Sequence, residues 1–321
     1  MLRTARPYNR RMRISRNEID LAWQRIQSHV RVTPTLQLNS ASLPVDAEIF
    51  LKLELMQVTG SFKPRGAFNR ILSNSVPEIG VIAASGGNHG LATAYAARQL
   101  GHRAEIFVPE ICSPVKQQRF RDYGAEVTIV GANYNEALRA STERARETGA
   151  LVVHAYNQPE TIAGQGTCGR EFDLQVPGLD AVLVAAGGGG FIAGIAAWFE
   201  GNARVIAVEP EQSCCLWSAF QKGEPVDSPV GGIAADSLGG TRVGELAWEI
   251  CRKYVHDAVR VTDDAIRDAQ RWLWNELRIV AEPGGATALA AVLSGAWRPA
   301  PSQRIGIVVC GSNADPKSIF Q

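Results

Sequence analysis

The segment Thr59-Gly-Ser-Phe-Lys-Pro-Arg-Gly-Ala67 is the most informative part of this sequence. Lys63 lies at its centre, with a glycine on either side and Pro64 directly after it. Glycine permits a tight or closely packed backbone path, and proline fixes φ, so we expect Lys63 on a stiff turn. An apolar strand predicted over residues 49–55 precedes this turn, and a helix start follows it.

The surroundings of Lys63 favour a chemical role for its amine. A lysine removed from water loses its proton more readily and becomes a nucleophile. Such an amine forms a Schiff base with an aldehyde cofactor. The alternative is a structural lysine that caps a loop, and the segment by itself does not separate the two roles.

Four consecutive glycines, Gly187-Gly-Gly-Gly190, lie between a fully apolar predicted strand (181–186) and a predicted helix (191–199). Their N–H groups are free to point at an anion at the start of the helix. The same residues also satisfy the dinucleotide pattern Gly188-x-Gly190-x-x-Ala193, with Glu209 ending the next strand. A nicotinamide-dependent oxidoreductase is therefore an alternative. We rank it lower because a single fingerprint often occurs by chance and this one leaves the Lys63 segment unexplained.

A second glycine turn, Ser85-Gly-Gly-Asn-His-Gly90, also follows a predicted strand. Ligands of open α/β sheets bind at the carboxyl ends of the strands. The Asn88 amide suits a phenolate oxygen of a cofactor, and the Ser85 hydroxyl with nearby N–H groups suits a substrate carboxylate. A single histidine is more often a packing or capping residue than a catalyst. The predicted substrate-binding residues are Ser85, Gly86, Gly87, Asn88 and His89.

Composition excludes several classes of protein. The 321 residues are 45% hydrophobic and 20% charged, as in a soluble globular protein, and the net charge of +1 gives no footprint for nucleic acid or membrane. The six cysteines form no CxxC pair, which favours reduced thiols. The arginine-rich first sixteen residues lack the apolar stretch of a secretory signal. We therefore expect a cytoplasmic protein. No cluster of ligand residues indicates a metal site.

Strands and helices alternate regularly from about residue 81 onward, which predicts an α/β fold with parallel sheets. We interpret the chain as two parallel-sheet domains, a large one from residues 1–79 and 158–321 and a small inserted one from residues 80–157. The small domain has predicted strands at residues 81–85, 104–108, 127–130 and 151–155. The large domain has further predicted strands at residues 181–186, 205–208 and 305–309.

Residues Glu54-Leu-Met-Gln-Val-Thr-Gly-Ser-Phe-Lys-Pro-Arg-Gly-Ala67 resemble the cofactor-lysine segment of fold-type II pyridoxal-phosphate enzymes. The serine/threonine dehydratases are the most similar group, with serine racemases as near relatives. Similar segments recur from about Thr33 to Asn313. The resemblance implies the tryptophan synthase β-like architecture, pyridoxal 5'-phosphate as the cofactor, Lys63 as the residue that holds it, and a homodimer.

The resemblance also implies roles for other segments. The tetraglycine is similar to the family's phosphate loop, and 308–313 resembles the segment whose Ser or Cys faces the pyridine nitrogen, here Cys310. A neutral thiol does not hold that nitrogen protonated, which suits elimination more than transamination. Residues 154–157 and 163–167 match family segments expected to line the cleft between the domains. The implied cofactor-binding residues are Phe62, Lys63, Asn88, Gly187, Gly188, Gly189, Gly190, Phe191, Glu282 and Cys310.

Two departures from the family pattern refine the expected activity. Gly86 stands where racemases carry a second serine as the acid–base group, and Cys215 stands where metal-binding members carry an aspartate. We therefore expect no metal site. The expected reaction is deamination of L-serine, L-threonine or a related β-hydroxy amino acid to a 2-keto acid and ammonia by α,β-elimination. A β-replacement synthase, an amino-acid racemase and a non-catalytic amino-acid sensor are the alternatives on this fold.

Overall fold

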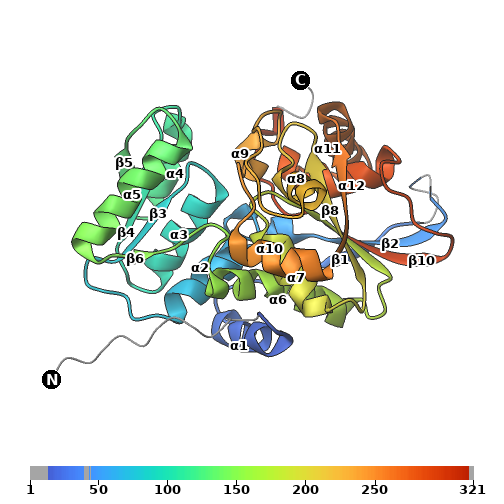
Figure 1. Cartoon of the computed structure of the whole chain (residues 1–321), viewed down its shortest axis with the longest axis horizontal. Coiled ribbons are helices and arrows are strands. Elements are labelled where there is room, and N and C mark those ends of the chain that lie inside the picture. Colours follow the sequence, from blue (N-terminus) through green and yellow to red (C-terminus); the bar gives the residue numbers. More distant parts are fainter. Residues whose placement is uncertain (1–13, 40–42, 44, 318–321) are drawn as a thin grey trace.

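The computed structural model describes residues 14–39, 43 and 45–317, and its strands form two separate sheets (Figure 1). The larger sheet has the order β1-β2-β10-β7-β8-β9, with β1 antiparallel to β2 and every other pair parallel. Its strands are β1 (Thr35–Gln37), β2 (Ala47–Lys52), β7 (Ala181–Ala185), β8 (Arg204–Pro210), β9 (Val255–Val261) and β10 (Gln303–Val308).

The smaller sheet is wholly parallel and has the order β5-β4-β3-β6. Its strands are β3 (Val81–Ala84), β4 (Ala104–Val108), β5 (Glu126–Ile129) and β6 (Leu151–Val152). All four come from the segment predicted as an inserted domain. The α/β class with parallel sheets is thereby confirmed, whereas the domain boundaries at residues 79/80 and 157/158 stay a prediction.

Helices lie against both sheets and between them (Figure 1). Three of them position the cavity described below. They are α2 (Lys63–Leu72), α3 (Asn88–Gln99) and α4 (Pro114–Asp122). The other helices are α1 (Arg16–Ile26), α5 (Tyr134–Thr148), α6 (Pro159–Gln175), α7 (Gly190–Phe199), α8 (Cys215–Lys222), α9 (Ala235–Leu238), α10 (Glu245–Tyr254), α11 (Asp263–Leu277) and α12 (Pro283–Leu293).

Local sequence explains where several of these elements begin and how deeply they are buried. Ser15 caps α1 in a reciprocal capping box with Glu18, and Ser113 caps α4 with Pro114 at the first helical position. Every residue of β7 is buried, because a parallel strand is covered by helices on both faces. The helix α7 that follows β7 is buried along its whole length. These two central elements place the glycine turn between them at the carboxyl edge of the large sheet.

Several elements differ from the prediction. The chain forms the strands β1 and β9, the long helix α6 and the short helices α8 and α9 where no regular structure was predicted. Most of the arginine-rich start of the chain lies outside the described residues. Within the described ranges, no helix is both long and apolar enough to cross a membrane.

Candidate active site

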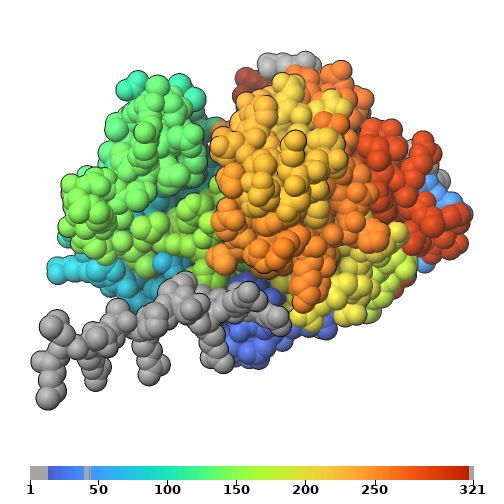
Figure 2. All heavy atoms as spheres, viewed as in Figure 1, coloured from blue at the N-terminus to red at the C-terminus, as the bar shows by residue number. Residues whose placement is uncertain are grey.

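A cavity of about 580 Å³ lies between two halves of the molecule, one built around the smaller sheet and the other around the larger sheet. Figure 2 shows these halves side by side, in green and in orange. Its volume is in the range of small-molecule sites. The wall is formed where β3 leads into α3 and β7 leads into α7, together with the start of α2. The carboxyl ends of strands from both sheets therefore meet at one site. The predicted residues that line it are Phe62, Lys63, Ser85, Gly86, Gly87, Asn88, His89, Gly187, Gly188, Gly189, Gly190 and Phe191.

Lys63 is the first residue of α2, and it forms part of the cavity wall. Its Nζ donates a hydrogen bond to the carbonyl oxygen of Ala155 at 3.0 Å. Desolvation lowers the pKa of the Lys63 ammonium to about 8, although Cys310 and Glu282 act in the opposite direction. A substantial fraction of this amine is therefore unprotonated at neutral to mildly alkaline pH.

The residues before Lys63 fix its position against the end of the large sheet. Ser61 forms an isolated bridge with Gly311, and the Phe62 N–H donates to the carbonyl oxygen of Cys310 at 3.3 Å. The Phe62 ring stacks on Phe191, with ring centroids 3.8 Å apart and an interplanar angle of 13°. The lysine turn is thus attached both to the residues that follow the strand β10 and to the helix that follows the four glycines.

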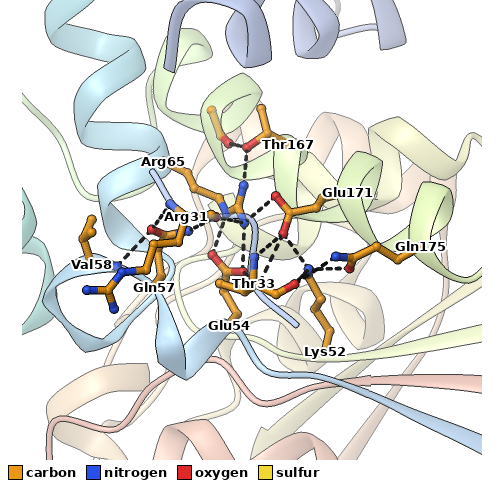
Figure 3. A network of polar contacts seen from close by, with 11 residues as sticks. Arg31, Thr33, Lys52, Glu54, Gln57, Val58, Arg65, Thr167, Glu171 and Gln175 are labelled. Carbon is orange, nitrogen blue, oxygen red and sulfur yellow. Dashed lines mark hydrogen bonds and ion pairs between the residues drawn. The ribbon is translucent and has the colours of Figure 1, made fainter. Parts of the chain in front are cut away.

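The residues after Lys63 are held by a buried network of charges, shown in Figure 3. The Arg65 guanidinium donates from Nε to Glu54 at 2.5 Å and from Nη2 to both Glu54 at 3.0 Å and Glu171 at 3.1 Å. Lys52 pairs with Glu171 at 2.6 Å. Two cations balance two carboxylates, and the network joins β2, α2 and α6. This network was not predicted from the sequence.

Neighbouring residues pack so closely on the glycines at 187–190 that larger side chains would not fit, whether or not a ligand binds there. A Cβ at Gly188 would lie 2.5 Å from Cε1 of the Tyr156 ring, and one at Gly190 would lie 2.6 Å from the Tyr156 carbonyl oxygen. Gly189 has a φ of +89°, which favours glycine. The N–H groups in the first turn of α7 have no acceptor within the helix, so they can bind an anion.

Asn88 connects the cavity to two segments at the end of the large sheet. Its Nδ2 donates to Oε1 of Glu282 at 2.7 Å, and its Oδ1 accepts from Asn313 Nδ2 at 2.7 Å. Burial raises the pKa of Glu282 to about 7. Glu282 and Cys310 are buried and do not line the cavity, but each is bonded to a residue that does, Asn88 and Phe62 respectively.

The turn at residues 85–90 presents small groups to the cavity. A Cβ at Gly86 would lie 3.5 Å from the Cys112 sulfur, an ordinary contact, so the position has room for a side chain. His89 contacts the Val153 carbonyl oxygen through Nε2 at 2.8 Å, and burial lowers its pKa to about 3. The imidazole is therefore neutral and anchors α3 to the residues after β6.

One of the two segments predicted to line the cleft does not line it. Residues 163–167 lie in the middle of α6, are buried and do not line the cavity. A Cβ at Gly164 would lie 2.4 Å from the Arg65 carbonyl oxygen, so this glycine permits close packing of α6 on α2. The other segment is placed as predicted in part, because Ala155 and Tyr156 line the cavity.

The carboxylate near Cys215 is held by backbone groups of the chain. The Glu209 carboxylate accepts hydrogen bonds from the N–H groups of Leu216 at 3.0 Å and Trp217 at 2.6 Å, at the start of α8. Burial raises the pKa of Glu209 to about 8. Among the described residues, no group of three or more His, Cys, Asp or Glu side chains could hold a metal ion.

The chain that forms this cavity is similar to known proteins. The family model described as "Pyridoxal-phosphate dependent enzyme" matches residues 26–311. The phenylserine dehydratase of Ralstonia pickettii is 35% identical over 296 residues, which cover 91% of this chain and 90% of the relative. The L-threonine ammonia-lyase of Thermotoga maritima is 34% identical over 311 residues, which cover 95% of this chain and 77% of the relative.

A solved structure agrees with these sequence relatives. Maize serine racemase superposes with a TM-score of 0.89 at 32% identity and covers 96% of both chains. The family resemblance, the fold and the cofactor inferred from the sequence are thereby confirmed. The chain belongs to the family of pyridoxal-phosphate dependent enzymes, as a serine/threonine dehydratase-like member of fold type II.

Proposed function

We propose that the protein is an ammonia-lyase that converts L-serine, L-threonine or a related β-hydroxy amino acid to a 2-keto acid and ammonia. The observation that carries this proposal is the Lys63 amine, whose pKa of about 8 makes it available as a nucleophile and base inside the cavity. The relatives are dehydratases and an ammonia-lyase, which perform this class of reaction.

The residues of the cavity fit pyridoxal 5'-phosphate. The four glycines leave the start of α7 free of side chains, which suits a phosphate group, and the desolvated Lys63 amine suits an aldehyde. When bound, the cofactor supplies an electron sink that makes the α-proton of the amino acid acidic. Phe62, Asn88, Phe191, Glu282 and Cys310 complete the proposed set of residues that hold or tune it.

We assign the roles in the proposed reaction to a small number of residues. Lys63 Nζ would hold the cofactor covalently, and its free amine would take the α-proton of the substrate. The Ser85 hydroxyl and the N–H groups of residues 86–89 bind the substrate carboxylate. Loss of the β-hydroxyl as water follows, and the resulting enamine hydrolyses to the keto acid and ammonia.

A substrate panel tests the proposed function. Purified holoprotein is incubated with L-serine, L-threonine, phenylserine and their D-isomers, and keto acid and ammonia are measured. Equal amounts of both products from at least one β-hydroxy amino acid support the proposal. Binding of the same amino acids with no product would favour the amino-acid sensor, and keto acid formed only with a nicotinamide would favour the oxidoreductase.

The pKa of Lys63 predicts how cofactor loading depends on pH. Only the unprotonated amine attacks an aldehyde, so the rate of loading of the apoprotein should rise as the pH passes about 8 and then level off. An ordinary lysine would give a midpoint near 10.4. The absorbance change on mixing apoprotein with pyridoxal phosphate measures this rate. A midpoint above pH 10 would show that Lys63 is not desolvated.

Racemisation is the second candidate function, because maize serine racemase is a structural neighbour. Elimination needs a base on one face of the substrate, whereas racemisation needs a proton donor on the other face, and Gly86 offers none. A proton-transfer group contributes about 10²–10⁴-fold to its step. We therefore expect D-serine formation to be slower than keto acid formation by at least about 10²-fold.

The variant Gly86→Ser tests this assignment. A Cβ at this position would meet the Cys112 sulfur at 3.5 Å and the Cys112 Cβ at 3.8 Å, both ordinary contacts, so the hydroxyl can be accommodated. The ratio of D-serine to keto acid, measured by chiral chromatography, should rise. Gly86→Ala is the matched control, because it adds the Cβ without a hydroxyl. Rapid racemisation by the unmodified protein would mean that another residue donates the proton.

We also propose, from the family resemblance, that the protein is a cytoplasmic homodimer and that residues 80–157 form a separate inserted domain. Light scattering at several protein concentrations tests the dimer.

A further inference from the structure

Two oppositely charged side chains bridge the cavity from its two halves. Apart from Lys63, the ionised side chains that line the cavity, among the described residues, are Lys116 and Asp236. The Lys116 ammonium lies 2.7 Å from each oxygen of the Asp236 carboxylate. Lys116 belongs to α4 beside the small sheet and Asp236 to α9 beside the large sheet, and these helices face each other in Figure 1.

This ion pair lies beside the turn to which the substrate carboxylate is assigned. Four residues before Lys116, ahead of the start of α4, the Cys112 sulfur lies 3.8 Å from the Gly86 carbonyl oxygen. On the other side, the Asp236 carbonyl oxygen lies 3.5 Å from the position that a Cβ at Gly87 would take. Both members of the pair are therefore anchored next to residues 86 and 87.

Charge balance makes Lys116 the available cation in this part of the cavity. An incoming amino acid adds a carboxylate, while the Lys63 amine is already assigned to holding the cofactor and taking the α-proton. The side chains of Lys116 and Asp236 are 36% and 61% exposed. Ion pairs that are this accessible to water contribute little net stability, so Lys116 can exchange one carboxylate for another at small cost.

We propose that Lys116 is the counter-ion of the substrate carboxylate and that Asp236 occupies the place of that carboxylate when no substrate is bound. Asp236 is then an internal competitor, and substrate binding exchanges one carboxylate for the other on Lys116. This inference rests on the proposed function, because it assigns a partner to the substrate of that same site.

The two single variants should change substrate binding in opposite directions. Lys116→Gln removes a charge-assisted contact with the substrate, so KM for the best substrate should rise about tenfold. Asp236→Asn releases Lys116, so KM should fall about two- to fivefold. The value of kcat should change much less than KM in both variants, because neither side chain takes part in proton transfer.

The opposite changes in KM distinguish this proposal from a purely structural ion pair, which would act as a latch that only holds the two halves together. A latch is broken equally by either variant, so both values of KM would move in the same direction. That result would overturn the proposal, as would an unchanged KM in Lys116→Gln.

The double variant Lys116→Gln/Asp236→Asn excludes a general effect of charge. If Asp236 acts through Lys116, the fall in KM caused by Asp236→Asn should vanish when Lys116 is absent. If the Asp236 carboxylate merely repels an anionic substrate, its effect should persist and add to that of Lys116→Gln, which would contradict the proposal.

Arg144→Gln is a matched control for the loss of one cation. Arg144 forms a partly exposed ion pair with Glu105 in the same half of the molecule, and neither residue lines the cavity. Its KM should equal that of the unmodified protein. Turnover by the unmodified protein is measured first. Absence of product there would count against the proposed function, whereas normal turnover with same-sign variants would count against this inference alone.

Discussion

Lys63→Ala is expected to lower the rate of keto acid formation by at least about 10⁴-fold. The variant loses both the amine that holds the cofactor and the base that takes the α-proton. The start of α2 should nevertheless fold, because its contacts are made by the backbone of Phe62 and by the side chain of Arg65. Turnover is measured with the best substrate of the panel and compared with Lys253→Ala, which changes an exposed lysine on α10.

Chemical labelling tests the same assignment without relying on turnover. Borohydride reduction of the holoprotein should fix the cofactor to Lys63. Lys52 is a fully buried lysine, but its amine already donates to the Thr33 carbonyl oxygen, Glu171 and Gln175 at 2.6–2.7 Å. Those three acceptors engage its amine, and Lys52 does not line the cavity. A labelled peptide that contains Lys52 or Lys116 would overturn the assignment of Lys63.

The fold was predictable where local sequence repeats a simple pattern. Apolar strands such as β7 and capped helices such as α4 carry their signals in a few consecutive residues. The helix α6 was missed because Gly164 and Gly166 suggest a loop. A Cβ at Gly166 would lie 2.8 Å from the Gly194 carbonyl oxygen on α7, so these glycines serve contact between helices. That requirement comes from tertiary packing and leaves no local signal.

The candidate site shows the same division. The lysine segment and the two glycine turns were identified because each is a short pattern with a chemical meaning. The network behind Lys63 was missed because it joins residues as distant as Lys52 and Glu171, and charged side chains are usually at the surface. One signal was present, since Lys52 and Glu54 interrupt an otherwise apolar run, which indicates burial with partners.

Arg65→Met is expected to reduce the free energy of unfolding by about 3–5 kcal/mol, because it leaves one excess buried carboxylate. The side chains of Arg65 and Glu54 are 0% exposed, and that of Glu171 is 6% exposed. Burial by itself would raise the pKa of Glu54, but the charge and hydrogen bonds of Arg65, with Lys52 and Thr33, hold it below its ordinary value. Without Arg65 the pKa of the Glu54 carboxyl should rise, because burial is then opposed by fewer interactions.

The sign of the pH dependence follows from this change. In the unmodified protein the lowered pKa of Glu54 gives stability that is present above its ordinary pKa and is lost as the pH falls through its folded value. In Arg65→Met that contribution is gone, so the loss of stability relative to the unmodified protein should be largest at neutral pH and smaller in acid. Urea unfolding at several pH values, followed by circular dichroism, measures it.

A second variant separates charge from packing. Arg65→Met/Glu54→Gln restores the balance of one cation, Lys52, and one carboxylate, Glu171, and should be more stable than Arg65→Met alone. Arg144→Met, which breaks a partly exposed ion pair, should cost no more than about 1 kcal/mol. If the double variant is instead less stable than Arg65→Met, the hydrogen bonds and shape of the guanidinium matter more than its charge. In that case the network would hold the lysine segment by packing, and the expected pH dependence would be absent.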